Sequence, residues 1–183
     1  MFKLPAVERV ERVLALKEIS NKLFRAQKYY KAAKMYIRIF EFFKSKDSKG
    51  NYSKEDSSTE EFQEAILKLR ELEKTNLTNL AVINLKQMQY GRCIEFCEKA
   101  IELEGENYTP TLIKAYFLLG KALIEHTEYT KAATTLEKLV QLATDNSDEE
   151  VQTEATNELN RAKAKKKQYQ DKFAAMAKKM FQQ

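Results

Sequence analysis

Residues 120–132, GKALIEHTEYTKA, carry a spacing that recurs in residues 20–32 (SNKLFRAQKYYKA) and 81–93 (AVINLKQMQYGRC). Each copy has a small residue, a tyrosine nine positions later, and a second small residue three positions after that: Ser20, Tyr29 and Ala32; Ala81, Tyr90 and Cys93; Gly120, Tyr129 and Ala132. In a pair of helices, the first small residue permits close approach, the tyrosine packs at the turn, and the second small residue receives the first helix. One pair cannot bury its apolar face alone, so stacked pairs are predicted.

Apolar residues at three-to-four spacing predict a helix on each side of every one of these tyrosines. The predicted helices cover about 5–26, 29–44, 58–88, 90–103, 109–126 and 129–143, and a seventh runs from about 147 toward the C-terminus. Ser58 with Glu61, and Ser147 with Glu150, resemble capping boxes at two of the starts. Only 4 Gly and 2 Pro occur in 183 residues, which favours an all-α protein over a multi-stranded sheet.

The predicted organisation is a helical-repeat domain over residues 1–146, with a polar loop at 45–57 inside it, followed by a capping and extended basic amphipathic helix over 147–183. Residues 161–183 hold eight Lys or Arg and one Asp, so a net charge of +7 lies in the tail. The total of +5 leaves −2 for residues 1–160. A generally basic, nucleic-acid-binding body is therefore not expected.

The repeated phrase resembles the tetratricopeptide-repeat (TPR) family, whose repeats are about 34 residues long. Phe24, Tyr36, Ala100, Tyr116 and Leu119 also match the family pattern, and the resemblance covers about residues 8–145. It implies three helix pairs in a right-handed superhelix plus a long C-terminal helix. Departures are Ile39 and Leu139 where alanine is usual, Asn84 where an aromatic residue is usual, and no proline closing any repeat.

Within that family, the chain is similar to the C-terminal TPR domains of large immunophilins and of aryl-hydrocarbon-receptor-interacting co-chaperones. The likeness rests on the phrases at 79–86 and 114–121 and on the lysine-rich final helix ending at Phe181. It implies a non-catalytic, co-chaperone-like adaptor that binds an acidic C-terminal peptide of a heat-shock chaperone. The alternative is a structural scaffold subunit of a larger assembly with a vestigial peptide site.

Chaperone-binding relatives hold a Glu-Glu-Val-Asp terminus in a clamp for two carboxylates. Carried over one position at a time, the clamp residues are Lys17, Asn21, Asn79 and Lys114, and the family's arginine four positions after the last lysine falls on Leu118. Charge-assisted bonds to carboxylates are strong, so this replacement is expected to weaken binding of the peptide. The competing interpretation is that the four are ordinary solvated positions.

Apolar residues repeat at helical spacing among the lysines of the tail: Tyr169, Phe173, Met176, Met180 and Phe181. Such a basic amphipathic helix predicts a surface for calmodulin, an acidic partner or anionic lipid. A solvating cap on the third repeat is the alternative, favoured for residues 147–165.

No metal, cofactor or enzymatic activity is expected. Cys93, Cys97 and His126 are too few for a zinc site of four ligands, and the two cysteines, four apart in one helix, are predicted as reduced core thiols. With one histidine and four scattered glycines, no catalytic grouping or phosphate loop is recognisable. No apolar run approaches the roughly 20 residues of a membrane span, and an intracellular, cytoplasmic protein with protein partners is predicted.

Overall fold

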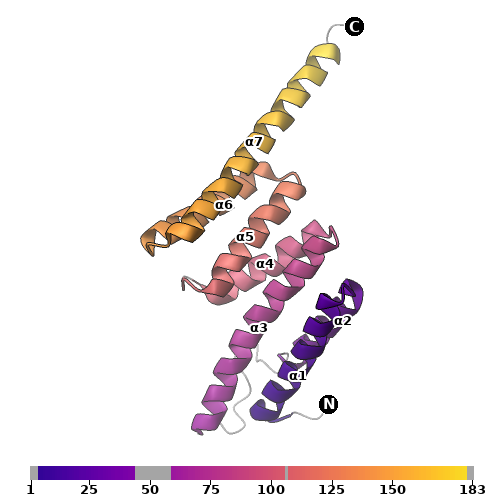
Figure 1. The fold of residues 1–183 in the computed structure, drawn as a ribbon, viewed down its shortest axis with the longest axis vertical. Helices are drawn as coiled ribbons and strands as arrows, with labels where there is room; N and C mark the ends of the chain where they lie inside the picture. The colour runs from indigo at the N-terminus through magenta and orange to yellow at the C-terminus, as the bar shows by residue number, and fades with distance from the viewer. Residues whose placement is uncertain (1–3, 44–58, 106, 181–183) are drawn as a thin grey trace. The chain divides into compact units, whose positions relative to one another are not determined.

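The computed structural model describes residues 4–43, 59–105 and 107–180, and in these it contains helices without strands (Figure 1). In chain order the elements are α1 (Ala6–Arg25), α2 (Tyr29–Ile39), the 3₁₀ turn η1 (Phe40–Phe42), α3 (Glu60–Lys86), α4 (Tyr90–Glu104), α5 (Pro110–Glu125), α6 (Tyr129–Asp145) and α7 (Glu149–Met180). The predicted all-α class is confirmed. The predicted loop at 45–57 lies outside the described residues.

The chain divides into two units, Met1–Met88 and Gln89–Gln183. In the first, α1 packs against α2 and α3, and α2 packs against α3. In the second, α4 packs against α5, and α6 packs between α5 and α7. The predicted boundary between residues 146 and 147 falls in the connection between α6 and α7, and it stays a prediction.

The small residues of the repeated phrase are buried, as their spacing predicts. Ser20, Ala32, Ala81, Cys93 and Ala132 have no exposed surface. At the sixth such position, Gly120, an added Cβ would lie 2.7 Å from Cδ2 of Leu136 in α6. The absence of a side chain on α5 therefore sets how closely α5 and α6 approach.

The turns before Tyr29, Tyr90, Tyr129 and Glu149 share one backbone geometry. A non-glycine residue with positive φ precedes each by two positions: Gln27 (56°), Met88 (57°), Thr127 (66°) and Ser147 (55°). At three of them a paired set of bonds closes the preceding helix, as between the Glu128 amide and the Leu123 carbonyl at 2.9 Å. The same tight turn therefore joins successive helices at four places in the chain.

Two of the predicted helix caps are wrong by one residue. The first turn of α3 is capped by Thr59, whose hydroxyl accepts from the Phe62 amide at 3.3 Å, and Ser58 lies outside the described residues. At α7 the cap is Asp148, whose Oδ1 accepts from the Val151 amide at 3.1 Å. Ser147 instead occupies the left-handed turn position, so it is one residue too early to cap the helix.

Candidate peptide-binding site

Three of the four predicted clamp residues lie in the first unit. Lys17 and Asn21 are one turn apart on α1, and Asn79 lies on α3, which packs against α1. All three side chains are half-buried.

The hydroxyl of Tyr36 in α2 joins the two asparagines. It donates to Oδ1 of Asn21 and accepts from Nδ2 of Asn79 at 3.2 Å. Tyr36 is 2% exposed, and burial raises the pKa of its hydroxyl, although the bond from Asn79 acts in the opposite direction. The hydroxyl therefore stays protonated and able to donate. Because Oδ1 of Asn21 accepts this bond, its Nδ2 end is directed to other partners.

Lys17 on α1 and Lys68 on α3 repel each other electrostatically. Burial lowers the pKa of Lys17, and the charge of Lys68 on α3 lowers it further. An anion bound near both ammonium groups relieves their repulsion. This part of the unit is electrostatically suited to a carboxylate.

A shallow pocket of about 280 Å³ continues from Lys68 toward the start of α1. Besides Lys68, it is lined by the apolar residues Val7, Val10 and Ala65 and by two acids, Glu61 and Glu64. A peptide residue next to the bound carboxylate fits this pocket better when its side chain is apolar than when it is acidic, because the two glutamates repel anions.

Lys114 and Leu118 lie in the second unit, one turn apart on α5. They line a pocket of about 440 Å³ between α5 and α7, together with Phe117, Val151 and two glutamates, Glu150 and Glu154. Lys121 also lines the pocket, so its two lysines are matched by two glutamates, and Leu118 itself offers only hydrocarbon to a carboxylate. The structure groups Lys17, Asn21 and Asn79 in one unit, and a clamp that includes Lys114 stays a prediction.

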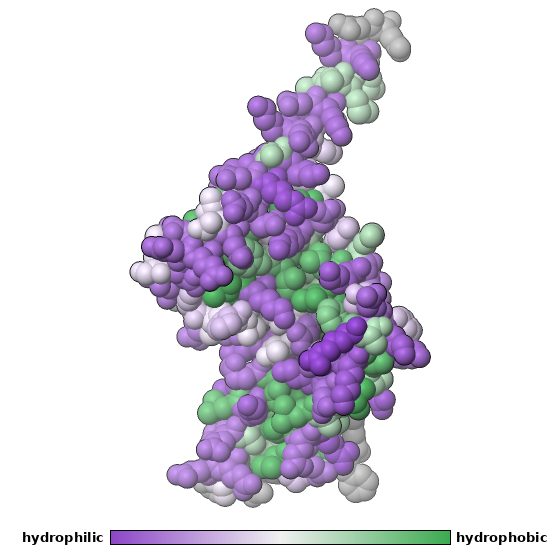
Figure 2. Space-filling view, in the orientation of Figure 1, coloured by the Kyte–Doolittle hydropathy of each residue, from purple (hydrophilic) through white to green (hydrophobic). Residues whose placement is uncertain are grey.

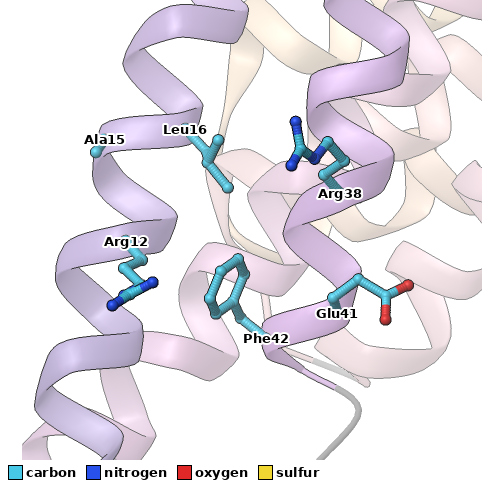
Figure 3. A pocket seen from close by; sticks show the side chains of 6 residues that line it. All are labelled: Arg12, Ala15, Leu16, Arg38, Glu41 and Phe42. Atoms are coloured by element: carbon cyan, nitrogen blue, oxygen red, sulfur yellow. The ribbon is translucent and has the colours of Figure 1, made fainter. Parts of the chain in front are cut away.

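A further pocket lies on the other side of α1 (Figure 3). It has a volume of about 390 Å³, and the Phe42 ring points into it from η1 toward α1. It is lined by Arg12, Ala15, Leu16, Arg38, Glu41 and Phe42. Ala15 and Lys17 are about 200° apart around the helix, so this pocket is separate from the predicted clamp.

The base of the predicted docking tail is held on the third repeat. Arg161 of α7 pairs with Glu125 of α5 at 2.5 Å, and Lys163 pairs with Glu137 of α6 at 3.0 Å. The Tyr169 ring lies 5.9 Å from the Tyr129 ring at the start of α6. Beyond it Phe173, Met176 and Met180 are exposed, and Phe181 lies outside the described residues.

Other predicted features are placed as follows. Cys93 and Cys97 are fully buried thiols in α4, and the hydrogen bond with Cys93, then burial, raises the pKa of Cys97. His126 contacts Glu128 at 2.8 Å. Within the described ranges, no cluster of three or more His, Cys, Asp or Glu side chains is placed to hold a metal, and no helix is long and apolar enough to cross a membrane.

Tyr36 and Lys68 are the two site residues that the sequence analysis did not assign to binding. Lys68 and Asn79 are eleven positions apart, which is close to three helical turns, so a single face of α3 carries both. The sequence spacing alone could therefore have predicted that Lys68 and Asn79 share a face. Tyr36 matches the repeat pattern, but its hydroxyl bridge depends on the packing of three helices.

No known protein-family profile matches the sequence. Peptidyl-prolyl cis-trans isomerase FKBP4 of Mus musculus is 26% identical over 178 residues, which cover 96% of this chain and 35% of that protein. FKBP4 of Homo sapiens is 27% identical over 145 residues, covering 79% of this chain and 28% of the relative. The chain thus spans about a third of the length of these relatives.

Among solved structures, the chain is similar to the C-terminal TPR-containing domain of a putative FK506-binding protein of Plasmodium falciparum. The TM-score is 0.67 at 20% sequence identity, with 92% of this chain and 97% of that domain covered. The order of three helix pairs and a long final helix is the order that the repeat phrase predicts. The chain therefore has a TPR fold, similar to that of the C-terminal domain of FK506-binding proteins.

Proposed function

We propose that the chain is a non-catalytic, co-chaperone-like adaptor whose groove binds an acidic C-terminal peptide of a heat-shock chaperone. The observation that carries the proposal is the hydrogen-bonded set of Asn21, Tyr36 and Asn79, one helical turn along α1 from Lys17, whose charge is disfavoured by burial and by Lys68. Amide donors fixed by a buried hydroxyl, one turn from a half-buried cation, provide a preorganised site for a terminal carboxylate.

The proposed binding is weak, because Leu118 provides no donor for the second carboxylate. Loss of one charge-assisted bond, about 1.5–3 kcal/mol, weakens binding roughly tenfold to a hundredfold. Leu118→Arg restores a guanidinium, but Glu150 and Glu154 line the same pocket and compete for it. Leu118→Arg is therefore expected to raise affinity for the peptide by an amount near the lower end of that range, about tenfold.

The test is calorimetric titration with a Glu-Glu-Val-Asp peptide and with its C-terminally amidated form. Lys17→Ala and Asn79→Ala are expected to weaken binding, and amidation to abolish it. Lys22→Ala is the matched control: Lys22 is an exposed lysine of α1 paired with Glu18 at 2.7 Å, about 140° around the helix from Lys17. Equal, negligible heats for the wild type and Leu118→Arg would refute the proposal.

A scaffold subunit that docks through α7 is the second candidate. It is favoured by the part of α7 beyond Ala162, the last buried residue of the helix, which extends about 27 Å to Met180. Affinity purification from the protein's own cells separates the two functions. Partners lost with Phe173→Ser but retained with Lys17→Ala support the scaffold, and the reverse supports the adaptor.

A cytoplasmic location is proposed with either function. Its support is the pair of buried, unoxidised thiols, Cys93 and Cys97, which fit a reducing compartment.

A further inference from the structure

One side of α7 carries a continuous stripe of residues whose spacing alternates between four and three. Its first part, Ala155, Leu159 and Ala162, is buried. Ala155 belongs to the core that α7 shares with Leu112 of α5 and Leu139 of α6. This part of the stripe therefore packs against α5 and α6.

The same stripe continues past the last repeat through Lys166, Tyr169, Phe173, Met176 and Met180. Phe173 is 68% exposed, Met176 64% and Met180 75%, although each occupies the stripe that buries Leu159. The mean period is 3.5 residues, which is the repeat of a coiled-coil seam. Tyr169 still contacts the Tyr129 ring at the start of α6, and beyond it α7 extends past α6 without a neighbouring helix of its own unit (Figure 1).

Lysines follow one flank of this exposed seam. With Phe173 at position a and Met176 at position d of a heptad, Lys165, Lys172 and Lys179 all occupy position g. Lys166 lies within the seam itself, at an a position, and is half-buried. Figure 2 shows this segment as mainly hydrophilic, with small apolar patches. Residues 163–180 contain seven lysines and one acid, Asp171.

We propose that residues 163–180 form a coiled-coil docking helix for an acidic amphipathic helix of a partner protein, with apolar a and d positions and glutamate or aspartate flanking them. Each g-position lysine then pairs with a carboxylate across the interface. An acid opposite Lys166 fixes the register, because a charged residue at a single a position is tolerated only in the matching alignment.

The charges favour an acidic partner over a second copy of this chain. In a parallel pair of copies, Lys165 faces Gln170 and Lys172 faces Ala177, so no ion pair forms. In an antiparallel pair the g-position lysines face one another and repel. Flanking lysines and Lys166 also make the apolar stripe narrower than the face of a helix lying on a membrane.

This inference gives the scaffold alternative a partner of stated chemistry, and it does not depend on the carboxylate site in the first unit. The experiment uses the full chain and a labelled synthetic peptide of three heptads with Leu at a and d, Glu at e and g, and one Glu at a central a position. Fluorescence anisotropy at low salt is expected to show binding. A second probe with Lys in place of every Glu is expected not to bind.

Charge exchange provides the decisive comparison. Lys172→Glu with Lys179→Glu is expected to lose about tenfold in affinity for the acidic probe and to gain binding to the lysine probe. Binding of this variant to the lysine probe would show that its lost affinity for the acidic probe does not result from misfolding. Lys167→Glu with Lys178→Glu makes the same charge change away from the seam and is expected to retain binding to the acidic probe.

Three outcomes would overturn the proposal. Equal weakening by the two charge-reversed pairs would mean general charge attraction. Self-association of the wild type that is lost in Phe173→Ala with Met176→Ala would assign the seam to a second copy. Cosedimentation with phosphatidylserine-containing vesicles, with no binding to either probe, would assign the helix to a membrane surface.

Discussion

Removal of one oxygen atom, in Tyr36→Phe, is expected to destabilise the first unit and to weaken carboxylate binding together. The ring stays in place, so no cavity of ring size forms, and only the hydroxyl bonds to Asn21 and Asn79 are lost. Both asparagines are half-buried, and water can partly replace the lost hydroxyl. At about 0.5–1.5 kcal/mol for each bond, a loss of about 1–2 kcal/mol in the free energy of unfolding is expected.

Peptide binding is expected to weaken because the two amides are no longer held by a common partner. Reorienting them on binding adds an ordering cost of about 0.5–1.5 kcal/mol for a side chain, which corresponds to roughly twofold to thirteenfold in affinity.

Urea unfolding followed by circular dichroism, and calorimetric titration of the Glu-Glu-Val-Asp peptide, measure the two effects. Tyr30→Phe is the matched control, because Tyr30 is on the same helix and 71% exposed, and it is expected to change stability by less than about 0.5 kcal/mol. If Tyr36→Phe and Tyr30→Phe unfold at the same urea concentration and bind alike, the hydroxyl bridge does not organise the site.

Three further results are expected. Since the pKa of Lys17 is lowered below 10.5 by burial and by the lysine opposite, stability rises with pH between the lowered pKa and 10.5. A bound carboxylate raises the pKa of Lys17 again, so binding of the peptide is expected to be coupled to proton uptake in that alkaline range. Calorimetric titrations of the peptide in two buffers of different ionisation enthalpy measure this uptake, which is expected to be smaller for Lys17→Ala. Thr127→Gly is expected to raise unfolding free energy by about 1 kcal/mol, because Thr127 is β-branched at a φ of 66°, whereas Thr134→Gly within α6 is expected to lower it by about 0.5 kcal/mol. Gly120→Ala is expected to cost about 1–2 kcal/mol in a urea melt, because the new methyl group meets Leu136 at 2.7 Å and this exceeds the gain in helix propensity; a more stable variant would contradict the packing argument.

The fold could be predicted because its determinants are local and repeated. Small residues at the positions of Ser20, Ala81 and Gly120 indicate close helix approach, and a proline after Thr109 marks the start of α5 where the structure has it. The caps at Thr59 and Asp148 were missed because neighbouring residues offer equivalent hydroxyl or carboxylate groups. The backbone of the preceding turn, which is not visible in the sequence, decides which of them caps.

The candidate site could be predicted only where one helix carries it. Lys17 and Asn21 are four apart, so their common face follows from helix geometry alone. The bridge through Tyr36 joins residues 15 and 43 positions away in the sequence, on two other helices. No periodicity within one helix contains that information, because it arises when α1, α2 and α3 pack together.

The opposed lysines of the first unit connect stability with binding. A folded chain without ligand gains nothing from holding Lys17 near Lys68, since the lowered pKa of Lys17 means that folding disfavours its charge. The same two charges favour a bound anion, because the anion removes their repulsion as well as attracting each of them. A pair of this kind lowers the stability of the empty chain and raises that of the liganded chain. Loss of the Lys68 charge is therefore expected to raise stability and to weaken carboxylate binding, and both effects are small because Lys68 is exposed.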